Sequence, residues 1–255
     1  TPGSRNVPRE NQAPLVKQLV SIDSQWKFQN EDESPSVDWI QSGFDDSEWS
    51  TGVGMFYANI EERTGAGDGL IGLWKFNETQ GVTVRNSATG VRGQLINGPT
   101  WISDAKRGRV LRFDGVNDYV VTDVDIPRMT LKNSFTWAFW AFSRNPANVN
   151  IIIGNRYRSD GTDFSPREFI KFTNGEFEFH RRGSGEGIDY PSIPVNTWVH
   201  HAVVKEGAKL TYYRDGSLLG QRTISEGLNN PQPFNFGGNR NRENWAGRLD
   251  DVAIW

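Results

Sequence analysis

The chain has 255 residues, a net charge of −3 at pH 7 and no cysteine. This length is enough for one large β domain or two smaller domains. The lack of cysteine excludes a disulfide framework, a thiolate nucleophile and a cysteine-ligated metal. The slightly negative charge and the lack of a nucleic-acid-binding motif argue against a nucleic-acid partner. No apolar run approaches the roughly 18–20 residues of a membrane span, so we expect no membrane insertion.

The first 69 residues differ in composition from the rest. They hold 5 Lys and Arg against 12 Asp and Glu, whereas the remaining residues hold 23 against 19. Residues 1–14 are polar and contain proline, which predicts a tail or linker. Residues 15–57 contain short alternating runs around the acidic turn FDDSEW, and residues 58–69 end in the glycine-rich RTGAGDG. We interpret residues 15–69 as a β-containing N-terminal extension or a partial module.

From Leu70 onward about a dozen short runs rich in Val, Ile, Phe, Tyr and Trp alternate with turn signals. Helical periodicity is nearly absent. Asn174-Gly175 and Asp215-Gly216 supply residues that favour the positive φ of tight hairpins. Short strands at this spacing predict an all-β fold, an antiparallel two-sheet sandwich or jelly roll over residues 70–255.

Alternation along two of these runs predicts which side chains share a face. In GEFEFHRR, Phe177 and Phe179 share one side, and Glu178, His180 and Arg182 share the other. The run FTWAFWAF (135–142) is apolar on both faces, which predicts a central strand. We expect its fourth aromatic residue, Trp140, to be covered by a loop or to line a groove.

The order of several segments is similar to that of a known family. GLWKFNETQG, GRVLRFDGVNDYVV, FTWAFWAF, NTWVHHAVVKEGAKLTYYRDGSLLG and WAGRLDDVAIW follow one another. This order resembles the laminin G-like, concanavalin A-like jelly-roll family in its bacterial multidomain form, over residues 70–255. The resemblance implies two stacked antiparallel sheets, calcium in many members, and glycan or protein binding instead of catalysis. It also implies a larger exported protein, and we interpret the end of the chain in VAIW as the edge of a fragment.

A weaker resemblance concerns the N-terminal region. WKFQ followed by FDDSEW, within residues 15–57, resembles the start of galactose-binding-like β-sandwich modules. Such a module needs more chain than this, so the alternative is an extension whose strands pack on the main domain.

The stretch FDGVNDYV (113–120) places two aspartates and an asparagine at a strand end. Calcium takes 6–8 oxygen ligands from carboxylates, carbonyls and water. The family pattern brings this segment beside LDDV near the chain end, which implies a structural calcium ion held by Asp114 and Asp250. The alternative is that these are turn residues, which Asp, Asn and Gly favour in any case.

Sequence motifs for catalysis are weak. Hydrolases of this fold carry an E-x-D-x-x-E arrangement, which the candidate pairs Glu176/Glu178 and Asp123/Asp125 do not match. His200 and His201 are neighbours on a predicted strand and point to opposite faces, so they cannot form one metal pair. We therefore expect a non-catalytic module, with a polysaccharide hydrolase or lyase of the same fold as an alternative.

Three loop segments are candidates for a binding surface: Asn155–Phe164, Phe179–Tyr190 and Gly238–Trp245. Guanidinium groups bind sulfate and carboxylate in a bidentate manner, and aromatic rings stack on sugars. If the segments converge, they form a basic, aromatic-lined patch suited to an anionic glycan. The candidate ligand-binding residues are Arg156, Tyr157, Arg158, His180, Arg182, Tyr190, Arg240, Arg242 and Trp245.

Simpler explanations exist for these residues. Arg158 and Arg182 each have Asp or Glu nearby in the sequence, so surface ion pairs would explain them, and Trp245 would fill the edge of the sandwich. The partner expected from the sequence is a glycan or a cell-surface protein, and the oligomeric state stays open.

Overall fold

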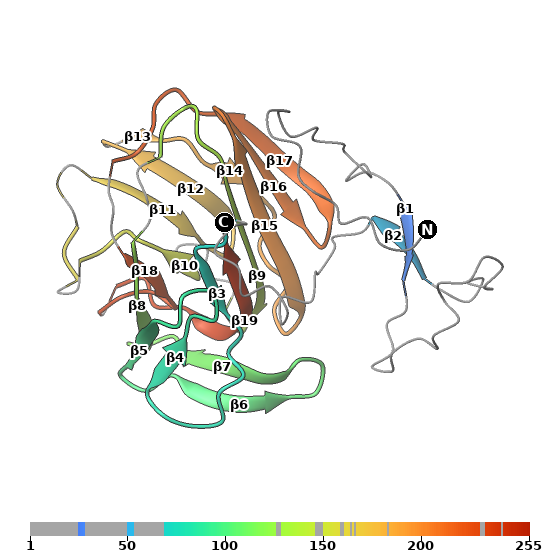
Figure 1. The fold of residues 1–255 in the computed structure, drawn as a ribbon, viewed down its shortest axis with the longest axis vertical. Helices are drawn as coiled ribbons and strands as arrows, with labels where there is room; N and C mark the ends of the chain where they lie inside the picture. The colour runs from blue at the N-terminus through green and yellow to red at the C-terminus, as the bar shows by residue number, and fades with distance from the viewer. Residues whose placement is uncertain are drawn as a thin grey trace, which may run out of the picture. The chain divides into compact units, whose positions relative to one another are not determined.

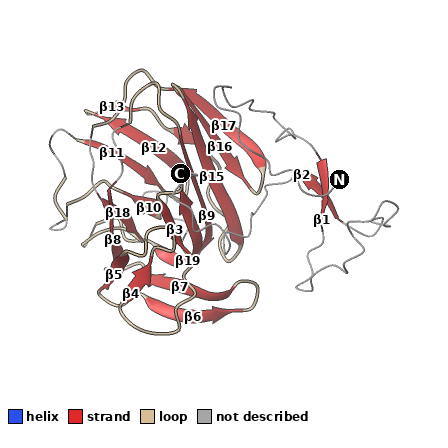
Figure 2. Cartoon of the chain, viewed as in Figure 1, coloured by secondary structure: helices blue, strands red, loops and turns tan. Residues whose placement is uncertain are grey.

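The computed structural model describes the strands Gln25–Phe28 and Ser50–Val53 and residues 69–255, with gaps at 126–128, 146–149, 159–160, 164, 166, 183, 230–232 and 241. Every element named in these residues is a β-strand, drawn red in Figure 2. No helix in the described ranges is long and apolar enough to cross a membrane. The chain divides into two compact units, Thr1–Ala58 and Asn59–Trp255.

The first unit contains one small sheet. β1 (Gln25–Phe28) pairs antiparallel with β2 (Ser50–Val53), with Gln25 opposite Val53. Both strands lie within the region where the sequence predicts short strands. The predicted tail at residues 1–14 lies outside the described residues, as does most of the stretch that resembles a galactose-binding-like module, so both stay predictions.

The second unit consists of two antiparallel sheets, which Figure 1 shows as separate layers. The nine-stranded sheet has the order β13 (Ser184–Gly185), β12 (Glu176–Arg181), β11 (Glu168–Phe172), β10 (Ile153–Gly154), β18 (Pro233–Phe236), β8 (Tyr119–Asp125), β5 (Arg92–Ile96) and β4 (Thr83–Arg85), with β14 (Ile188–Asp189) also paired to β12. The eight-stranded sheet has the order β17 (Ser217–Thr223), β16 (Lys209–Arg214), β15 (Trp198–Glu206), β9 (Phe135–Ser143), β19 (Ala246–Ile254), β7 (Gly108–Asp114) and β6 (Thr100–Asp104), with β3 (Gly72–Trp74) also paired to β19. The predicted all-β antiparallel two-sheet sandwich is thereby confirmed.

The core lies between the two sheets and is largely aromatic. β9 alternates strictly between buried and half-buried residues, so Phe135, Trp137 and Phe139 point inward. The Trp137 ring packs edge-on against Phe234 of the opposite sheet, with ring centroids 4.5 Å apart. Edge-to-face pairs of this kind stabilise a core beyond the area they bury. β9 lies between β15 and β19, which confirms the predicted central strand.

The two predicted hairpin turns differ in backbone conformation. Asp215 and Gly216 both have positive φ, at 48° and 76°, as a two-residue turn of the predicted kind requires. Asn174 and Gly175 close the β11–β12 hairpin without positive φ, so the predicted conformation is wrong there. The buried Asn174 side chain contacts other segments instead: its Nδ2 donates to the Asn145 carbonyl at 2.5 Å.

The outer face of the eight-stranded sheet carries a covered aromatic group. The Arg107 guanidinium, in the β6–β7 turn, lies 4.3 Å above the centre of the Trp140 ring. Trp140 is therefore covered by a loop, which is the first of its two predicted environments. His201 stacks on Phe139 in the core with ring centroids 4.8 Å apart, whereas His200 packs against Trp140 on the outer side. The two histidines therefore point to opposite faces, as the sequence predicts.

Candidate functional site

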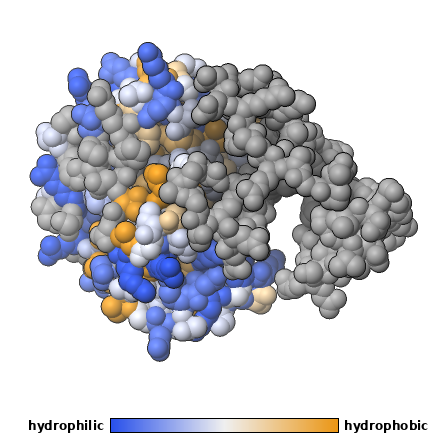
Figure 3. Space-filling view, in the orientation of Figure 1, coloured by the Kyte–Doolittle hydropathy of each residue, from blue (hydrophilic) through white to orange (hydrophobic). Residues whose placement is uncertain are grey.

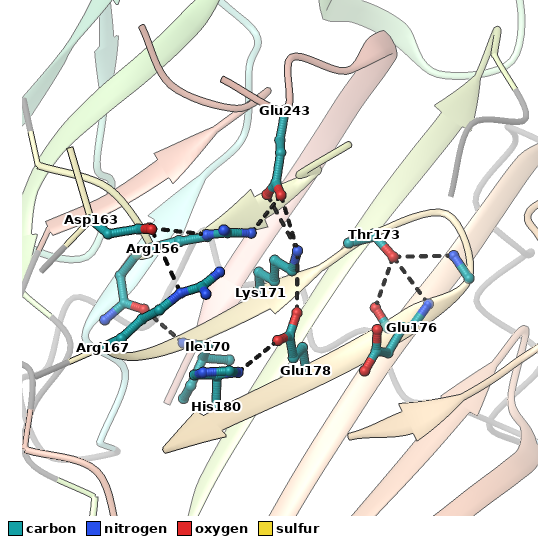
Figure 4. Close-up of polar contacts among 12 residues, drawn as sticks. Arg156, Asp163, Arg167, Ile170, Lys171, Thr173, Glu176, Glu178, His180 and Glu243 are labelled. Carbon is teal, nitrogen blue, oxygen red and sulfur yellow. Dashed lines mark hydrogen bonds and ion pairs between the residues drawn. The ribbon is translucent and has the colours of Figure 1, made fainter. Parts of the chain in front are cut away.

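Alternation in β11 and β12 places a charged surface on the outer face of the nine-stranded sheet. Ile170, Phe172, Phe177 and Phe179 belong to the core cluster. The residues between them therefore point outward. The strand register pairs Lys171 with Glu178 and Phe169 with His180. Together with residues of two loops they form what we call the outer-face network: Arg156, Asp163, Arg167, Lys171, Glu178, His180 and Glu243 (Figure 4).

Lys171 is the centre of the outer-face network. Its side chain is only 6% exposed, and its Nζ lies 3.2 Å from Glu178 Oε2 and 3.3 Å from Glu243 Oε2. Glu178 faces Lys171 because the two residues are direct partners in the β11–β12 ladder. Glu243 reaches the same ammonium group from the loop before β19 (Figure 4). The structure thus brings two carboxylates to one buried cation.

Arg156 is the second buried cation of the outer-face network and contacts two carboxylates. Its Nη1 donates to Glu243 Oε1 at 2.5 Å, and its Nε donates to Asp163 Oδ1 at 3.2 Å. The guanidinium carbon lies 5.2 Å from the centre of the Phe169 ring, in cation–π range. Burial lowers the pKa of Arg156, but the charges of Glu243 and Asp163 outweigh burial, so this pKa lies above its ordinary value. Arg156 therefore stays charged and oriented.

His180 connects the network to the buried ring of Phe169. Its ring stacks on Phe169 with centroids 4.5 Å apart and an angle of 2° between the planes. Nδ1 lies 2.9 Å from Glu178 Oε1, while Nε2 is buried and has no hydrogen-bond partner within the described residues. A buried polar atom of this kind is normally satisfied by water or a ligand.

Two of the three predicted loop segments converge above this surface. The side-chain Nδ2 of Asn239 donates to the Tyr157 carbonyl at 3.5 Å, and a Cβ built on Gly161 would lie 2.9 Å from the Arg240 carbonyl oxygen. Arg158, Arg240 and Arg242 are exposed on these loops. The convergence of Asn155–Phe164 with Gly238–Trp245 thus gives the network a rim that carries three arginines.

Other predicted binding residues lie in the interior. Tyr190 is in the core, where its hydroxyl donates to the Thr173 carbonyl at 2.7 Å. Trp245 is fully buried and its indole nitrogen donates to Asn174 Oδ1 at 3.3 Å. Tyr157 is also buried, and burial followed by the charge of Glu243 raises its pKa to about 12. These three rings stabilise the fold and are not available as a platform for sugars.

Arg182 lies apart from the network. It follows the end of β12 with a φ of 42°, and its Nε donates to Glu168 Oε1 at 3.3 Å. Both residues line a hollow of about 300 Å³ that also includes Met129 and Asn229. The third predicted segment therefore contributes only His180 to the outer-face network.

The structure does not bring the two predicted calcium ligands together. In the β7–β19 ladder Asp114 is opposite Ala246. Asp250 lies four residues further along β19, about 13 Å away at roughly 3.3 Å per residue. Asp114 Oδ1 instead accepts hydrogen bonds from the amides of Val116 and Asn117, at 2.7 and 3.4 Å, as a turn residue does.

Asp250 also has a different partner. Arg107 Nε donates to Asp250 Oδ2 at 2.5 Å and Arg107 Nη2 donates to Asp251 Oδ2 at 2.6 Å. No group of three or more His, Cys, Asp or Glu residues in the described part of the chain is arranged to hold a metal ion. The pair Asp114/Asp250 thus does not fit a shared ion, and calcium binding stays a prediction of the resemblance alone.

Sequence reasoning missed Lys171 and Arg167, and it passed over Asp163 and Glu243 within segments that it selected. One signal could have found Lys171: in REFIKF it lies between Ile170 and Phe172, which alternation assigns to the core. Its ion pairs could not be deduced locally, because Glu243 lies 72 residues further along the chain. The outer-face network itself is balanced, because its three cations, Arg156, Arg167 and Lys171, are matched by three carboxylates. The predicted excess of positive charge is therefore found only among the exposed arginines of the rim.

The superfamily follows from a comparison of sequences. A laminin G-like sequence model, described as the concanavalin A-like lectin/glucanases superfamily, matches residues 114–255. The chain belongs to this superfamily. Its name covers both lectins and glucanases, so membership does not distinguish binding from catalysis. No curated protein is significantly similar to the chain.

Solved structures with the same fold are distant in sequence. Domain 4 of AbnA, an extracellular arabinanase from Geobacillus stearothermophilus solved with arabinotriose, is 12% identical, with a TM-score of 0.51 over 72% of this chain and 91% of that chain. Trypanosoma rangeli sialidase, solved with sialic acid, is 15% identical, with a TM-score of 0.51 over 73% of this chain and 30% of that one. The receptor-binding domain of botulinum neurotoxin type G is 13% identical, with a TM-score of 0.52 over 73% of this chain and 47% of that one. At these identities the likeness establishes the fold alone.

Proposed function

We propose that residues 70–255 form a non-catalytic carbohydrate-binding module whose ligand lies on the outer-face network. The observation that carries this proposal is the position of Lys171, which is almost fully buried on the outer face between two carboxylates. Buried ion pairs are seldom more stable than apolar residues of similar volume, so fold stability alone does not account for such a network. Charged side chains with fixed partners are well placed to bind the hydroxyl groups of a sugar.

Two further observations bear on the kind of ligand. On the face viewed in Figure 3, hydrophilic residues predominate among the described residues and hydrophobic ones form small areas. The arabinanase domain of the same fold was solved with an oligosaccharide, arabinotriose. The first observation gives no support to a large apolar docking surface on that face, and the second makes a glycan the first ligand class to test.

A glycan array followed by calorimetry tests the proposal. We expect at least one oligosaccharide to bind the wild-type protein, and Lys171→Met to weaken that binding at least tenfold. Lys209→Met is the matched control, because Lys209 is exposed on β16 of the other sheet. Equal binding by wild type and Lys171→Met would place the ligand elsewhere. Thermal unfolding checks that both variants fold.

The first rival is a structural or protein-interaction domain, for instance one that binds a cell-surface protein. An array without any binding glycan, together with the capture of a defined protein by the same surface, would favour this rival. In that case Lys171→Met should abolish the protein interaction.

The second rival is a polysaccharide hydrolase or lyase. One observation favours it, since Glu178 and Glu243 both lie within 3.3 Å of the same ammonium group. Glycosidases use two carboxyl groups, one of which donates a proton. Here both are engaged in ion pairs, which supports binding over catalysis. Release of reducing sugar from a polysaccharide, abolished by Glu178→Gln, would contradict the non-catalytic proposal.

We extend the proposal to the parent protein, a larger bacterial protein that is exported. The support is the family resemblance and the extracellular location of the arabinanase that carries a domain of this fold. Detection of the protein in the medium or on the surface of the producing cells tests this; retention in the cytoplasm would contradict it.

A further inference from the structure

Glu243 binds both cations of the outer-face network. Its Oε1 accepts from Arg156 Nη1 at 2.5 Å and its Oε2 lies 3.3 Å from Lys171 Nζ. A single carboxylate held by a guanidinium and an ammonium group is the arrangement in which proteins bind a ligand carboxylate. Here a side chain of the chain itself occupies that position (Figure 4).

The two cations do not depend on Glu243. Arg156 Nε still donates to Asp163 Oδ1 at 3.2 Å, and Lys171 Nζ still lies 3.2 Å from Glu178 Oε2. Each therefore keeps one carboxylate partner when the Glu243 side chain turns away. Asp163, whose side chain is 41% exposed, and Glu178 would then be the partners that keep both cations in place for another anion.

Glu243 can turn away without movement of its loop. Its carbonyl accepts a hydrogen bond from the Ile151 amide at 2.8 Å, and the neighbouring Trp245 is fully buried, so the backbone is fixed. The Glu243 side chain is 18% exposed, which leaves it a path to solvent. Its φ of 46° lies in the left-handed region, where a glutamate is uncommon and where such strain tends to mark functional sites.

The surroundings favour an anion from outside. Arg240 and Arg242 are exposed on the same loop as Glu243. Charges of this kind attract an anionic ligand and raise its rate of association. The exposed arginines of the rim thus add a positive charge that the outer-face network lacks, because its own cations and carboxylates are equal in number.

We propose that the carboxylate of Glu243 is an internal occupant of an anion-binding position between Arg156 and Lys171, and that the glycan ligand carries an acidic, carboxylate-bearing sugar that replaces it. This inference rests on the proposed carbohydrate-binding function. It makes Glu243 a specificity-determining residue that competes with the ligand. Removal of its charge should therefore strengthen the binding of acidic glycans.

Calorimetry on wild type, Glu243→Gln and Glu206→Gln tests the inference. The probes are the acidic oligosaccharides that bind best on an array of uronate- and sialate-containing glycans, and the same oligosaccharides with the carboxyl group reduced to an alcohol. We expect reduction to weaken wild-type binding at least tenfold, and Glu243→Gln to bind the acidic form at least fivefold more tightly. Glu206→Gln removes one negative charge from an exposed position on β15 and should not change the affinity.

Each outcome has a distinct meaning. If wild type binds acidic and reduced forms equally, or if it binds only neutral glycans and Glu243→Gln changes nothing, the inference is overturned and the proposed function stands. Weaker binding of the acidic form by Glu243→Gln would also overturn the inference, because Glu243 would then be a ligand contact. If neither wild type nor Glu243→Gln binds any glycan, the proposed function fails and the inference with it.

Discussion

Asp250 illustrates how burial can outweigh an ion pair at the scale of one residue. The side chain is 4% exposed and contacts Arg107, yet its pKa is raised to about 7. Burial is the largest cause, the charge of Asp251 adds to it, and the contact with Arg107 only partly compensates. The carboxyl group is therefore more easily protonated in the folded state than in the unfolded state.

This shift predicts the direction of a pH effect on stability. Because the folded pKa lies above the unfolded one, the contribution of this carboxyl to stability is complete below about pH 4 and is lost as the pH rises to about 7. Asn cannot ionise, so Asp250→Asn should gain stability relative to wild type over this range. At about 1.4 kcal/mol per pKa unit, the gain between pH 4 and pH 8 is at most about 4 kcal/mol.

Urea unfolding of both proteins at several pH values measures this difference. Comparison with Asp215→Asn separates the effect from the general loss of a charge, because Asp215 is exposed in a hairpin turn and an Asn side chain can still accept the hydrogen bond from the His200 amide. A difference between wild type and Asp250→Asn that is constant from pH 4 to pH 8 would show that Asp250 is ionised throughout.

At the scale of the element, Gly237 shows why the turn after β18 needs glycine. Its φ is 80°, and a Cβ built there would lie 2.2 Å from Cδ1 of the Phe113 ring. Gly90 has the same φ, but a Cβ there would meet no atom within 4 Å. The two glycines thus share the backbone requirement and differ in packing.

Substitutions of Gly90 and Gly237 separate the effect of the backbone conformation on stability from the effect of side-chain packing. We expect Gly90→Ala to lower the free energy of unfolding by about 1–2 kcal/mol, the cost of a left-handed conformation for an L-residue. Gly237→Ala should cost a further 1–3 kcal/mol or so, because the added methyl group overpacks the core against Phe113. Denaturant unfolding of both variants measures the difference; equal losses would mean that the Phe113 ring moves aside freely.

Strand geometry explains which parts of the sandwich could be predicted from the sequence and which could not. Alternation within β12 correctly grouped Phe177 and Phe179 on one face and Glu178 and His180 on the other, because a strand repeats every two residues. The register between β7 and β19 is set by pairing across the sheet, which places Asp114 opposite Ala246, four residues before Asp250. No local pattern in the sequence reveals this register, so the separation of Asp114 and Asp250 could not be predicted.

Loops were the hardest part of the site to predict. The convergence of Tyr157 with Asn239 depends on contacts between segments 82 residues apart in the sequence. Aromatic residues in such segments look alike in sequence whether they face a ligand or the core, and Tyr190 and Trp245 proved to be core residues.

The calcium prediction stays testable by a thermal melt with calcium and with EDTA, in which an unchanged midpoint would contradict it.

At the scale of the whole molecule, the division into Thr1–Ala58 and Asn59–Trp255 predicts independent behaviour of the larger unit. A shortened chain that begins at Asn59 should unfold in one cooperative transition, with a midpoint within about 2 °C of that of the same unit in the full chain. Compact units with their own core normally fold alone. Calorimetry of both chains tests this, and a large drop in the midpoint on shortening would show that residues 1–58 stabilise the sandwich.

Hydrogen exchange measured with and without a saturating glycan tests whether the ligand lies on the outer face of the nine-stranded sheet. We expect slower exchange in β10–β12 and in residues 239–245, with little change in β9, β15 and β19, which form the centre of the other sheet. Protection confined to the eight-stranded sheet would place the ligand on the opposite face and contradict the proposed binding surface.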